Sequence, residues 1–280
     1  MQPAGKHLGE AFQRAGGVPA VIGELLAAGL LHKNAPTVTG KTLAENVGDT
    51  RSADTDVILT VDSPMRANAG FLVLSGNLFD SALMKTSVIS DDFRQRFLSK
   101  KGSEGVHEAR AIVFEGPEDY HHRLNDPELA IDENCILFIR GVGPVGYPGS
   151  AEVVNMQPPD ELLKAGINHL PTVGDGRQSG TSESPSILNA SPEAAIGGGL
   201  ALLQTGDKVR LDITNRKLDA IVPEDEWQAR KDAWTPDIRD HQTPWQELYR
   251  THVGQLSEGG CLEYATNYQR VGRNLPRDNH

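Results

Sequence analysis

The segment Ile136–Ile139 is a run of apolar residues that is too short for a stable helix and has no polar face. Such a run is typical of a strand covered on both sides, so we expect it near the centre of a sheet. Residues 70–78 and 109–114 predict two further strands. Apolar and polar residues alternate over 209–213 and again over 218–222, which predicts a hairpin. The chain is therefore expected to fold around a sheet.

Helices are expected between these strands. Apolar spacing predicts a helix over residues 18–26. Residues 191–193, Ser-Pro-Glu, predict the N-cap and first turn of another helix, which ends near Gly206. Two more are predicted over 223–235 and around 248–256. The 29 glycines and 17 prolines argue against an all-helical bundle. We expect a mixed α/β fold, a barrel or curled sheet with helices around it.

The charge of the chain limits its partners. It carries 27 basic and 38 acidic residues, a net charge of −11. An acidic chain repels phosphate backbones, so we expect no nucleic-acid partner. No apolar run approaches the roughly 20 residues that span a bilayer, and the first residues have no apolar signal core. We therefore expect no membrane partner and a cytoplasmic location.

The cysteines exclude several kinds of site. There are two, Cys135 and Cys261, and they form no CxxC pair. A disulfide-stapled secreted domain is therefore excluded, as is a zinc or iron–sulfur site built only on cysteines of this chain. Cys135 begins the apolar run Cys135–Ile139, where we expect a buried, unreactive thiol.

Two glycine-rich loops are the segments most suited to chemistry. The first spans residues 140–152, directly after the central strand, and the second spans 174–182. Neither fits the G-x-G-x-x-G fingerprint before a helix, and neither is a Walker loop, so a dinucleotide or nucleoside triphosphate site is not expected. Glycine at this density makes turns or lets a ligand approach the backbone, and the spacing alone leaves both readings open.

Single residues in these loops also leave alternatives open. Ser179 lies in no G-x-S-x-G elbow, and it is either a nucleophile or base or simply a turn former. Glu152 is either a Mg²⁺ ligand or a solvated side chain. The nine histidines offer no metal-binding spacing, and His107 and the pair His121–His122 are expected at the surface because their neighbours are polar.

Several segments together resemble the C-terminal half of the dihydroxy-acid dehydratase/phosphogluconate dehydratase family. The resemblance rests on the two loops and on Ser191–Ala195, and it extends in collinear order from Ala15–Ala20 to the end of the chain. Gln178, the segment 185–189 and the ending 274–280 look most like the branch that acts on sugar acids, the aldonates or pentonates such as arabinonate and xylonate.

This resemblance implies a fold and a domain organisation. It implies a swivelling β-barrel domain with surrounding helices, over residues 59–280. Residues 1–58 would be a short helical and extended remnant of an N-terminal α/β domain, with the linker between the domains.

The resemblance also implies a chemistry. Family members dehydrate a polyhydroxy acid at C2 and C3 to a 2-keto-3-deoxy acid, using an iron–sulfur cluster and Mg²⁺. Ser179 is at the position of the serine that removes the C2 proton, and Glu152 is at the position of a Mg²⁺ ligand. The backbone N–H groups of Gly180 and Thr181 are expected to bind substrate oxygens, and His280 to reach the substrate pocket.

One departure from the family bears on activity. The family's cluster cysteines belong to its N-terminal domain, and Cys135 and Cys261 do not match them. We expect a fragment that is inactive alone, that needs the N-terminal dehydratase domain as partner, and whose full-length form is a homo-oligomer. Two alternatives stay open. The chain is a non-catalytic barrel that acts as a binding module, or it is a stand-alone acyl or phosphate enzyme that uses Ser179.

Overall fold

The structure is a computed structural model that describes residues 6–65, 70–178, 185–238 and 240–268. The chain divides into two compact units, Met1–Asn68 and Ala69–His280. Each unit has buried apolar residues of its own. The domain boundary expected after residue 58 stays a prediction.

The first unit is a small group of helices around a thin core. Its helices are α1 (Gly9–Arg14), α2 (Gly17–Ala27) and α3 (Leu43–Val47). α2 covers the predicted helix 18–26. The buried apolar residues of this first unit are Ala15, Ala20 and Ile58. α3 begins with a capping box, in which Thr42 and Glu45 exchange hydrogen bonds between side chain and backbone.

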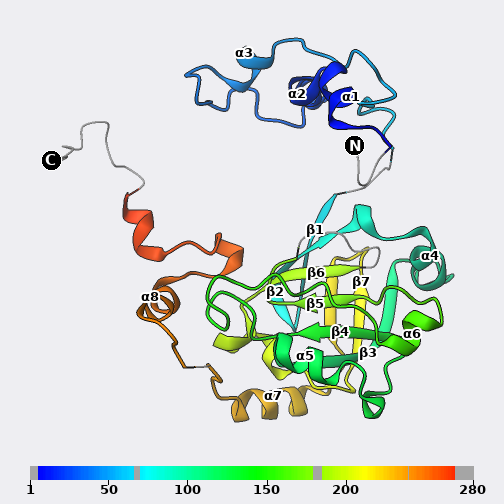
Figure 1. Cartoon of the computed structure of the whole chain (residues 1–280), viewed down its shortest axis with the longest axis vertical. Helices are drawn as coiled ribbons and strands as arrows, with labels where there is room; N and C mark the ends of the chain where they lie inside the picture. The colour runs from blue at the N-terminus through cyan, green and yellow to red at the C-terminus, as the bar shows by residue number, and fades with distance from the viewer. Residues whose placement is uncertain (1–5, 66–69, 179–184, 239, 269–280) are drawn as a thin grey trace. The chain divides into compact units, whose positions relative to one another are not determined.

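The second unit is a closed barrel of eight strands (Figure 1). The strands are β1 (Phe71–Gly76), β2 (Phe79–Lys85), β3 (Val106–Phe114), β4 (Cys135–Ile139), β5 (Thr172–Gly174), β6 (Ser186–Ser191), β7 (Lys208–Asp212) and β8 (Lys217–Ala220). Their order around the barrel is β1-β2-β6-β5-β4-β3-β7-β8. β3, β4, β5 and β6 are parallel neighbours, while β2 and β7 pair antiparallel with the strands beside them. The expected mixed α/β barrel is confirmed.

β4 is buried on both faces, as the apolar run predicts. Ile136 and Phe138 point into the barrel and join its main core. Cys135, Leu137 and Ile139 point outward into a second core. That core is covered by α5 (Pro117–Arg123) and α6 (Asp160–Lys164), which lie against the outside of the barrel (Figure 1). Because side chains alternate between the two faces of a strand, this one short segment contributes residues to both cores.

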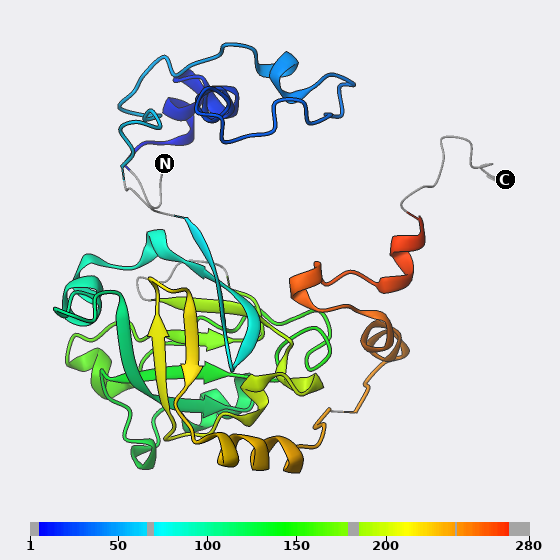
Figure 2. The same ribbon diagram turned by 180° about the vertical axis from the view of Figure 1, so that it is seen from behind.

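The predicted hairpin is present as β7 and β8, which lie side by side (Figure 2). Val209 pairs with Ala220, and Leu211 with Leu218. β8 also closes the barrel against β1, but only through one residue pair, which joins Ser75 to Lys217. Side chains add to this seam. The Asn77 N–H donates to Asp219 Oδ1 and the Ala220 N–H donates to Asn77 Oδ1, each at 2.8 Å.

The prediction of a helix that begins at Ser191 is wrong. Ser191 ends β6, and short 3₁₀ turns over Ala194–Ile196 and Gly199–Leu202 follow. Residues 197–199 are three consecutive glycines, which are poor helix formers; two of them separate the turns and the third begins the second turn. The backbone there is tightly packed, since a Cβ on Gly198 would lie 1.9 Å from the carbonyl oxygen of Pro192.

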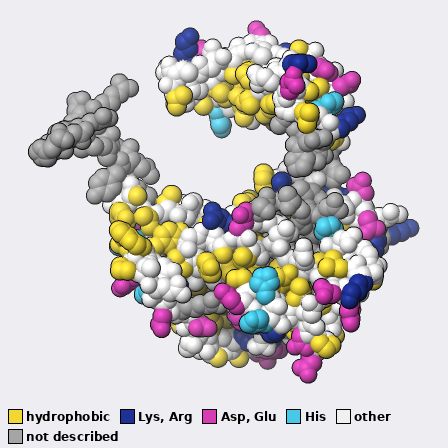
Figure 3. Space-filling view, viewed as in Figure 1, with side chains coloured by type: hydrophobic (Ala, Val, Ile, Leu, Met, Phe, Trp, Pro, Cys, Tyr) yellow, Lys and Arg dark blue, Asp and Glu magenta, His cyan; other side chains and the backbone are white. Residues whose placement is uncertain are grey.

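The predicted helix over 223–235 is confirmed as α7 (Glu224–Ala233), and the last predicted helix begins and ends earlier than expected, as α8 (Pro244–His252). Hydrophobic side chains gather at the surface of this C-terminal part (Figure 3). They include Trp245, which is 76% exposed, with Leu248 and Tyr264. Among the helices that the structure describes, none is long and apolar enough to cross a membrane.

Candidate active site

The two glycine-rich loops leave the same edge of the barrel. β4 and β5 are parallel neighbours, so their carboxyl ends lie together. Residues 140–152 follow β4, and Asp175 opens the segment that follows β5. In parallel α/β sheets, ligands bind outside the carboxyl ends of the strands. This edge is therefore the candidate active site.

Asp175 is a fully buried carboxylate at this edge. Its Oδ1 accepts the N–H of Val142 at 3.0 Å, and its Oδ2 accepts the N–H groups of Gly141 at 3.1 Å and Ala194 at 2.9 Å. Burial raises the pKa of Asp175 to about 6, the charge of Glu193 adds to the rise, and the three N–H bonds oppose it. One side chain thereby links the segments that follow β4, β5 and β6.

Glu193 is a second fully buried carboxylate, and it binds the middle of the first loop. The N–H of Val145 donates to both of its oxygens, at 2.9 and 3.1 Å, and the N–H of Gly146 donates to Oε2 at 2.8 Å. Gln255, which follows α8, donates its Nε2 to Glu193 Oε1 at 2.9 Å and accepts the Glu193 N–H at 2.8 Å. Glu193 therefore supports a loop and does not open a helix.

Two arginines bind carbonyl oxygens of the same loop. Arg177 donates from Nε to the Ser150 oxygen at 2.8 Å and from Nη2 to the Gly149 oxygen at 2.9 Å. Arg250, on α8, donates from Nε to the Val145 oxygen at 2.8 Å. The loop has no regular secondary structure, yet side chains satisfy its N–H groups on one side and its carbonyls on the other.

Glu152 lies at the end of this loop, next to the segment that leads to the serine loop. The N–H of Arg177 donates to the Ala151 oxygen at 2.8 Å, and the N–H of Val154 donates to the Arg177 oxygen at 3.2 Å. Glu152 thus lies between two residues that pair with Arg177, and its side chain is exposed. The structure brings the Glu152 segment beside Arg177, which belongs to the second glycine-rich loop.

The other predicted site residues are Ser179, Gly180, Thr181 and His280, and all four lie outside the described residues. Their roles stay predictions, as does that of Glu152.

The described residues fit the two implied cofactors differently. Glu152 is an exposed carboxylate on a supported loop, and Mg²⁺ prefers such oxygen ligands. No group of three or more potential metal ligands occurs among the described residues, so Glu152 would be one ligand of an incomplete set. The described residues contain no group of cysteines that could hold an iron–sulfur cluster. Cys135 is buried against Asp132 and Arg110, and Cys261 lies after α8. Cys135 is buried, as expected. Burial raises the pKa of its thiol.

The expectation for the histidines is wrong in one case. His121 and His122 are exposed on α5, as predicted. His107 is only 2% exposed and packs edge-on against Phe93 and Phe97. Its polar neighbours in the sequence hid the fact that it lies on the inward face of β3.

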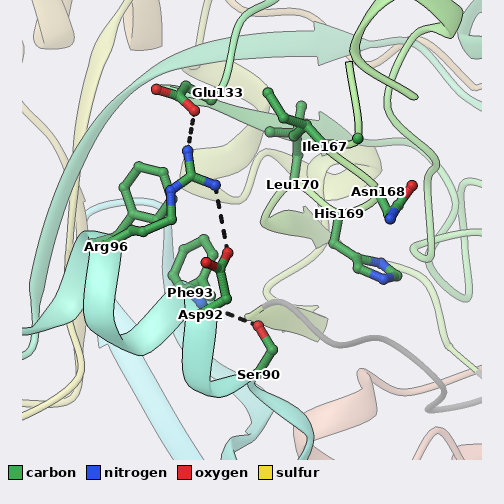
Figure 4. A pocket seen from close by; sticks show the side chains of 11 residues that line it. Ser90, Asp92, Phe93, Arg96, Glu133, Ile167, Asn168, His169 and Leu170 are labelled. Carbon is green, nitrogen blue, oxygen red and sulfur yellow. Dashed lines mark hydrogen bonds and ion pairs between the residues drawn. The ribbon is translucent and has the colours of Figure 1, made fainter. Parts of the chain in front are cut away.

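A separate pocket of about 220 Å³ opens at the other ends of β4 and β5 (Figure 4). Its wall includes Arg96, whose guanidinium lies between the carboxylates of Glu133 and Asp92. His169 and Asn168 lie across from this ion-paired group (Figure 4). Glu152, the one predicted site residue that the structure describes, does not line this pocket, and the charge of Arg96 is already paired.

The sequence analysis missed the residues that order the candidate site, Asp175, Glu193, Arg250 and Gln255. Asp175 lies inside a glycine-rich loop, where a carboxyl group can accept backbone N–H bonds, and this was the one available signal. The other three belong to distant segments, and only the fold brings them to the loop.

Comparison with known proteins gives a consistent family assignment. Residues 56–260 match the family model described as dihydroxy-acid/6-phosphogluconate dehydratase C-terminal, and residues 1–46 match the model described as the N-terminal part of the same family.

Individual relatives match over the length of the chain. A D-xylonate dehydratase of Caulobacter vibrioides is 61% identical over 280 residues, which is 100% of this chain and 47% of the relative. An L-arabinonate dehydratase of Rhizobium leguminosarum is 38% identical over 281 residues, 100% of this chain and 46% of the relative. A dihydroxy-acid dehydratase of Ignicoccus hospitalis is 37% identical over 94% of this chain and 46% of its own length. The chain spans about half the length of these relatives.

Proposed function

The chain belongs to the dihydroxy-acid/6-phosphogluconate dehydratase family, and on this basis we propose that it forms the C-terminal part of a hydro-lyase that converts a sugar acid to a 2-keto-3-deoxy acid. The relatives named for xylonate and arabinonate match the whole chain, and the one named for xylonate does so at 61% identity. This supports an aldonate as the substrate class.

The observation that carries the proposal is the pairing of Arg177 with Ala151 and Val154. It places Glu152 beside the segment that leads to Ser179. A metal-binding carboxylate and a base that takes a proton from the carbon next to a carboxylate must act on the same substrate, so their segments have to meet.

In the proposed reaction, Ser179 Oγ takes the proton from C2 of the substrate. The C2–H electrons form the C2=C3 double bond, and the C3–O bond breaks as the hydroxyl takes up a proton from solvent and leaves as water; Ser179 then returns its proton to solvent. The resulting enol becomes the 2-keto acid by moving a proton to C3. A free serine hydroxyl is a very weak base, so it needs an adjacent cation to lower its pKa.

Other residues of the chain bind and orient the substrate in this proposal. Glu152 would hold Mg²⁺, which when bound supplies positive charge to the substrate carboxylate and C2 hydroxyl. The N–H groups of Gly180 and Thr181 bind substrate oxygens, and His280 reaches the pocket. The family resemblance supports these roles.

The proposal includes a partner. The described residues provide one candidate Mg²⁺ ligand and no cluster ligands, so the 280 residues are expected to be inactive without the N-terminal dehydratase domain. A homo-oligomeric full-length form, a cytoplasmic location and the absence of nucleic-acid and membrane partners stay predictions.

A chimera tests the function. Residues 1–280 replace the matching part of the Caulobacter D-xylonate dehydratase, and the sequence identity of 61% favours a folded product. We expect the chimera to release a 2-keto acid from xylonate, arabinonate or gluconate, measured colorimetrically, and the 280 residues alone to release none.

Two controls make the result decisive. The unaltered Caulobacter enzyme reports that the assay works, and the circular dichroism spectrum of the chimera reports that it folds. A folded, metal-loaded chimera that leaves all three acids unchanged would overturn the proposal and favour a non-catalytic binding module. Turnover by the 280 residues alone would show that no partner domain is needed.

A further inference from the structure

We propose that Asp175 and Glu193 are positioning residues of the candidate site, whose buried carboxylates hold the loop of residues 141–151 in the shape that presents Glu152 beside Arg177. This inference rests on the proposed function for its catalytic consequence. The loop-ordering part stands on the contacts alone. We call the two side chains the carboxylate clamp.

The clamp accepts N–H groups that regular structure does not satisfy. Asp175 binds the amides of residues 141 and 142, and Glu193 binds those of residues 145 and 146. These four amides belong to one irregular stretch that joins β4 to Glu152. Hydrogen bonds from N–H groups to a carboxylate are about twice as strong as neutral ones. Losing them frees the stretch to adopt other backbone conformations.

The clamp is made for backbone N–H groups and not for a cation. Among the residues that the structure describes, neither Asp175 nor Glu193 has an ion-pair partner, although both are fully buried. A buried carboxylate without a counter-charge is costly unless hydrogen bonds satisfy it. Here the loop itself supplies them, so the negative charge is stable only while the loop keeps its shape.

The packing around Glu193 leaves no room for a side chain at residue 143. A Cβ added to Gly143 would lie 2.6 Å from Glu193 Oε2 and 2.8 Å from Glu193 Cβ. The loop backbone therefore lies directly on the Glu193 side chain, which only glycine permits at this point.

A third buried carboxylate shows what a purely local role looks like. Asp212, at the end of β7, accepts the N–H of Asn215 at 2.8 Å and its side-chain Nδ2 at 2.9 Å, three residues away. It closes the β7–β8 turn. The clamp residues instead reach partners 19 to 62 residues away along the chain. Asp212 therefore serves as the matched control.

The first experiment follows amide exchange in the full 280-residue chain. Asp175→Asn and Glu193→Gln keep shape but replace one acceptor oxygen with a donor. We expect hydrogen exchange at least about 10-fold faster at residues 141–142 in Asp175→Asn and at 145–146 in Glu193→Gln, because local opening controls exchange. Asp212→Asn should change exchange only near the β7–β8 turn. Unchanged exchange of the loop in both clamp variants would overturn the inference.

The second experiment measures kinetics in the chimera. A loop that misplaces Glu152 should lower kcat by about 100-fold, while KM changes by less than about threefold. Asp212→Asn should leave both constants unchanged per folded molecule. Faster loop exchange with an unchanged kcat would overturn the catalytic part, because the clamp would then be structural only.

A second variant covers the case in which a clamp variant does not fold. Gly143→Ala keeps both carboxylates and displaces the loop from Glu193, so it should lower kcat with the same small change in KM. An unchanged kcat in this variant would contradict the inference. If the unaltered chimera has no activity, the proposed function fails, while the exchange experiment still decides whether the clamp orders the loop.

Discussion

The imidazole of His107 lies edge-on to the ring of Phe97, with centroids 5.0 Å apart and ring planes at 68°. Phe93 packs on it in the same manner at 5.6 Å, and Nε2 is buried without a hydrogen-bond partner among the described residues. Burial lowers the pKa of His107 to about 4, and the positive charge of Lys100 adds to the effect. The core of this barrel therefore contains a neutral histidine.

The first prediction concerns acid stability. Above pH 6.5 the imidazole is neutral in both the folded and unfolded states. As the pH falls toward 4, only the unfolded chain takes up the proton, so the free energy of unfolding falls by up to about 3 kcal/mol. In His107→Leu this part of the loss should vanish. Urea unfolding between pH 4 and 7.5 measures it.

The control for this prediction is His121→Leu, which removes an exposed histidine from α5. It should leave the slope of stability against pH unchanged. Equal slopes for His107→Leu and the unaltered chain would show that His107 takes up its proton in the folded state as well.

The second prediction concerns the attachment of α7. Arg230 donates to both oxygens of Asp207, at 2.6 and 3.0 Å, and to the Leu202 oxygen, and its side chain is 11% exposed. The hydrogen bonds to Asp207 hold the pKa of Arg230 above its ordinary value. Arg230→Met should lower the free energy of unfolding by about 2 kcal/mol, since it removes the ion-pair partner of the half-buried Asp207 carboxylate.

Two comparisons test this reason. Adding Asp207→Leu to Arg230→Met should recover part of the stability, because the unpaired charge is gone. Lys208→Met breaks an exposed ion pair with Glu108 and should cost less than about 1 kcal/mol. If Arg230→Met costs no more than Lys208→Met in urea unfolding, the pair does not anchor α7.

The third prediction concerns thiol reactivity. Cys261 is exposed, whereas Cys135 is buried and its thiol pKa is raised. Ellman's reagent should label one thiol quickly and the second only after unfolding, because the thiolate is the reactive form. Cys261→Ser should remove the fast phase and Cys135→Ser the slow one. A fast phase that survives Cys261→Ser would mean that the Cys135 side of the outer core opens readily.

The fourth prediction concerns the chemistry of the chimera. Ser179→Ala should lower kcat by at least about 100-fold, since it removes the proposed base. Glu152→Gln should raise the Mg²⁺ concentration needed for half-maximal rate by roughly 10-fold, because it weakens one ligand. Glu161→Gln, an exposed glutamate on α6, is the control and should change neither. Full activity of Ser179→Ala would remove that residue from its role.

The sequence predicted the parts of the fold that carry their own signal. β4 is apolar on both faces, and the β7–β8 hairpin alternates cleanly. β5 has three residues, too few for any period. β6 contains polar residues that a strand seldom buries, such as Ser186, whose Oγ lies 3.0 Å from Thr172 Oγ1 on β5. That partner is known only once the strands are paired.

The candidate site divides in the same way. Glu152 was predicted because its loop resembles a family; the structure shows it exposed near Arg177, and its role stays a prediction. Asp175 and Glu193 were missed as a pair, since the amides that they bind lie 33 and 48 residues away in the sequence. His107 could have been found by extending β3 backward, because every second residue from His107 to Val113 points inward.

The seam between β1 and β8 has a consequence for how the chain is made on the ribosome. The first and last strands of the barrel are neighbours, so the ring stays open until residue 220 has been synthesised. Until then β1 has an unpaired edge. The outer edge of β2 stays unpaired until β6 has been made. Open strand edges invite pairing with other chains. The nascent barrel therefore exposes strand edges that can pair with other chains until β8 has emerged from the ribosome.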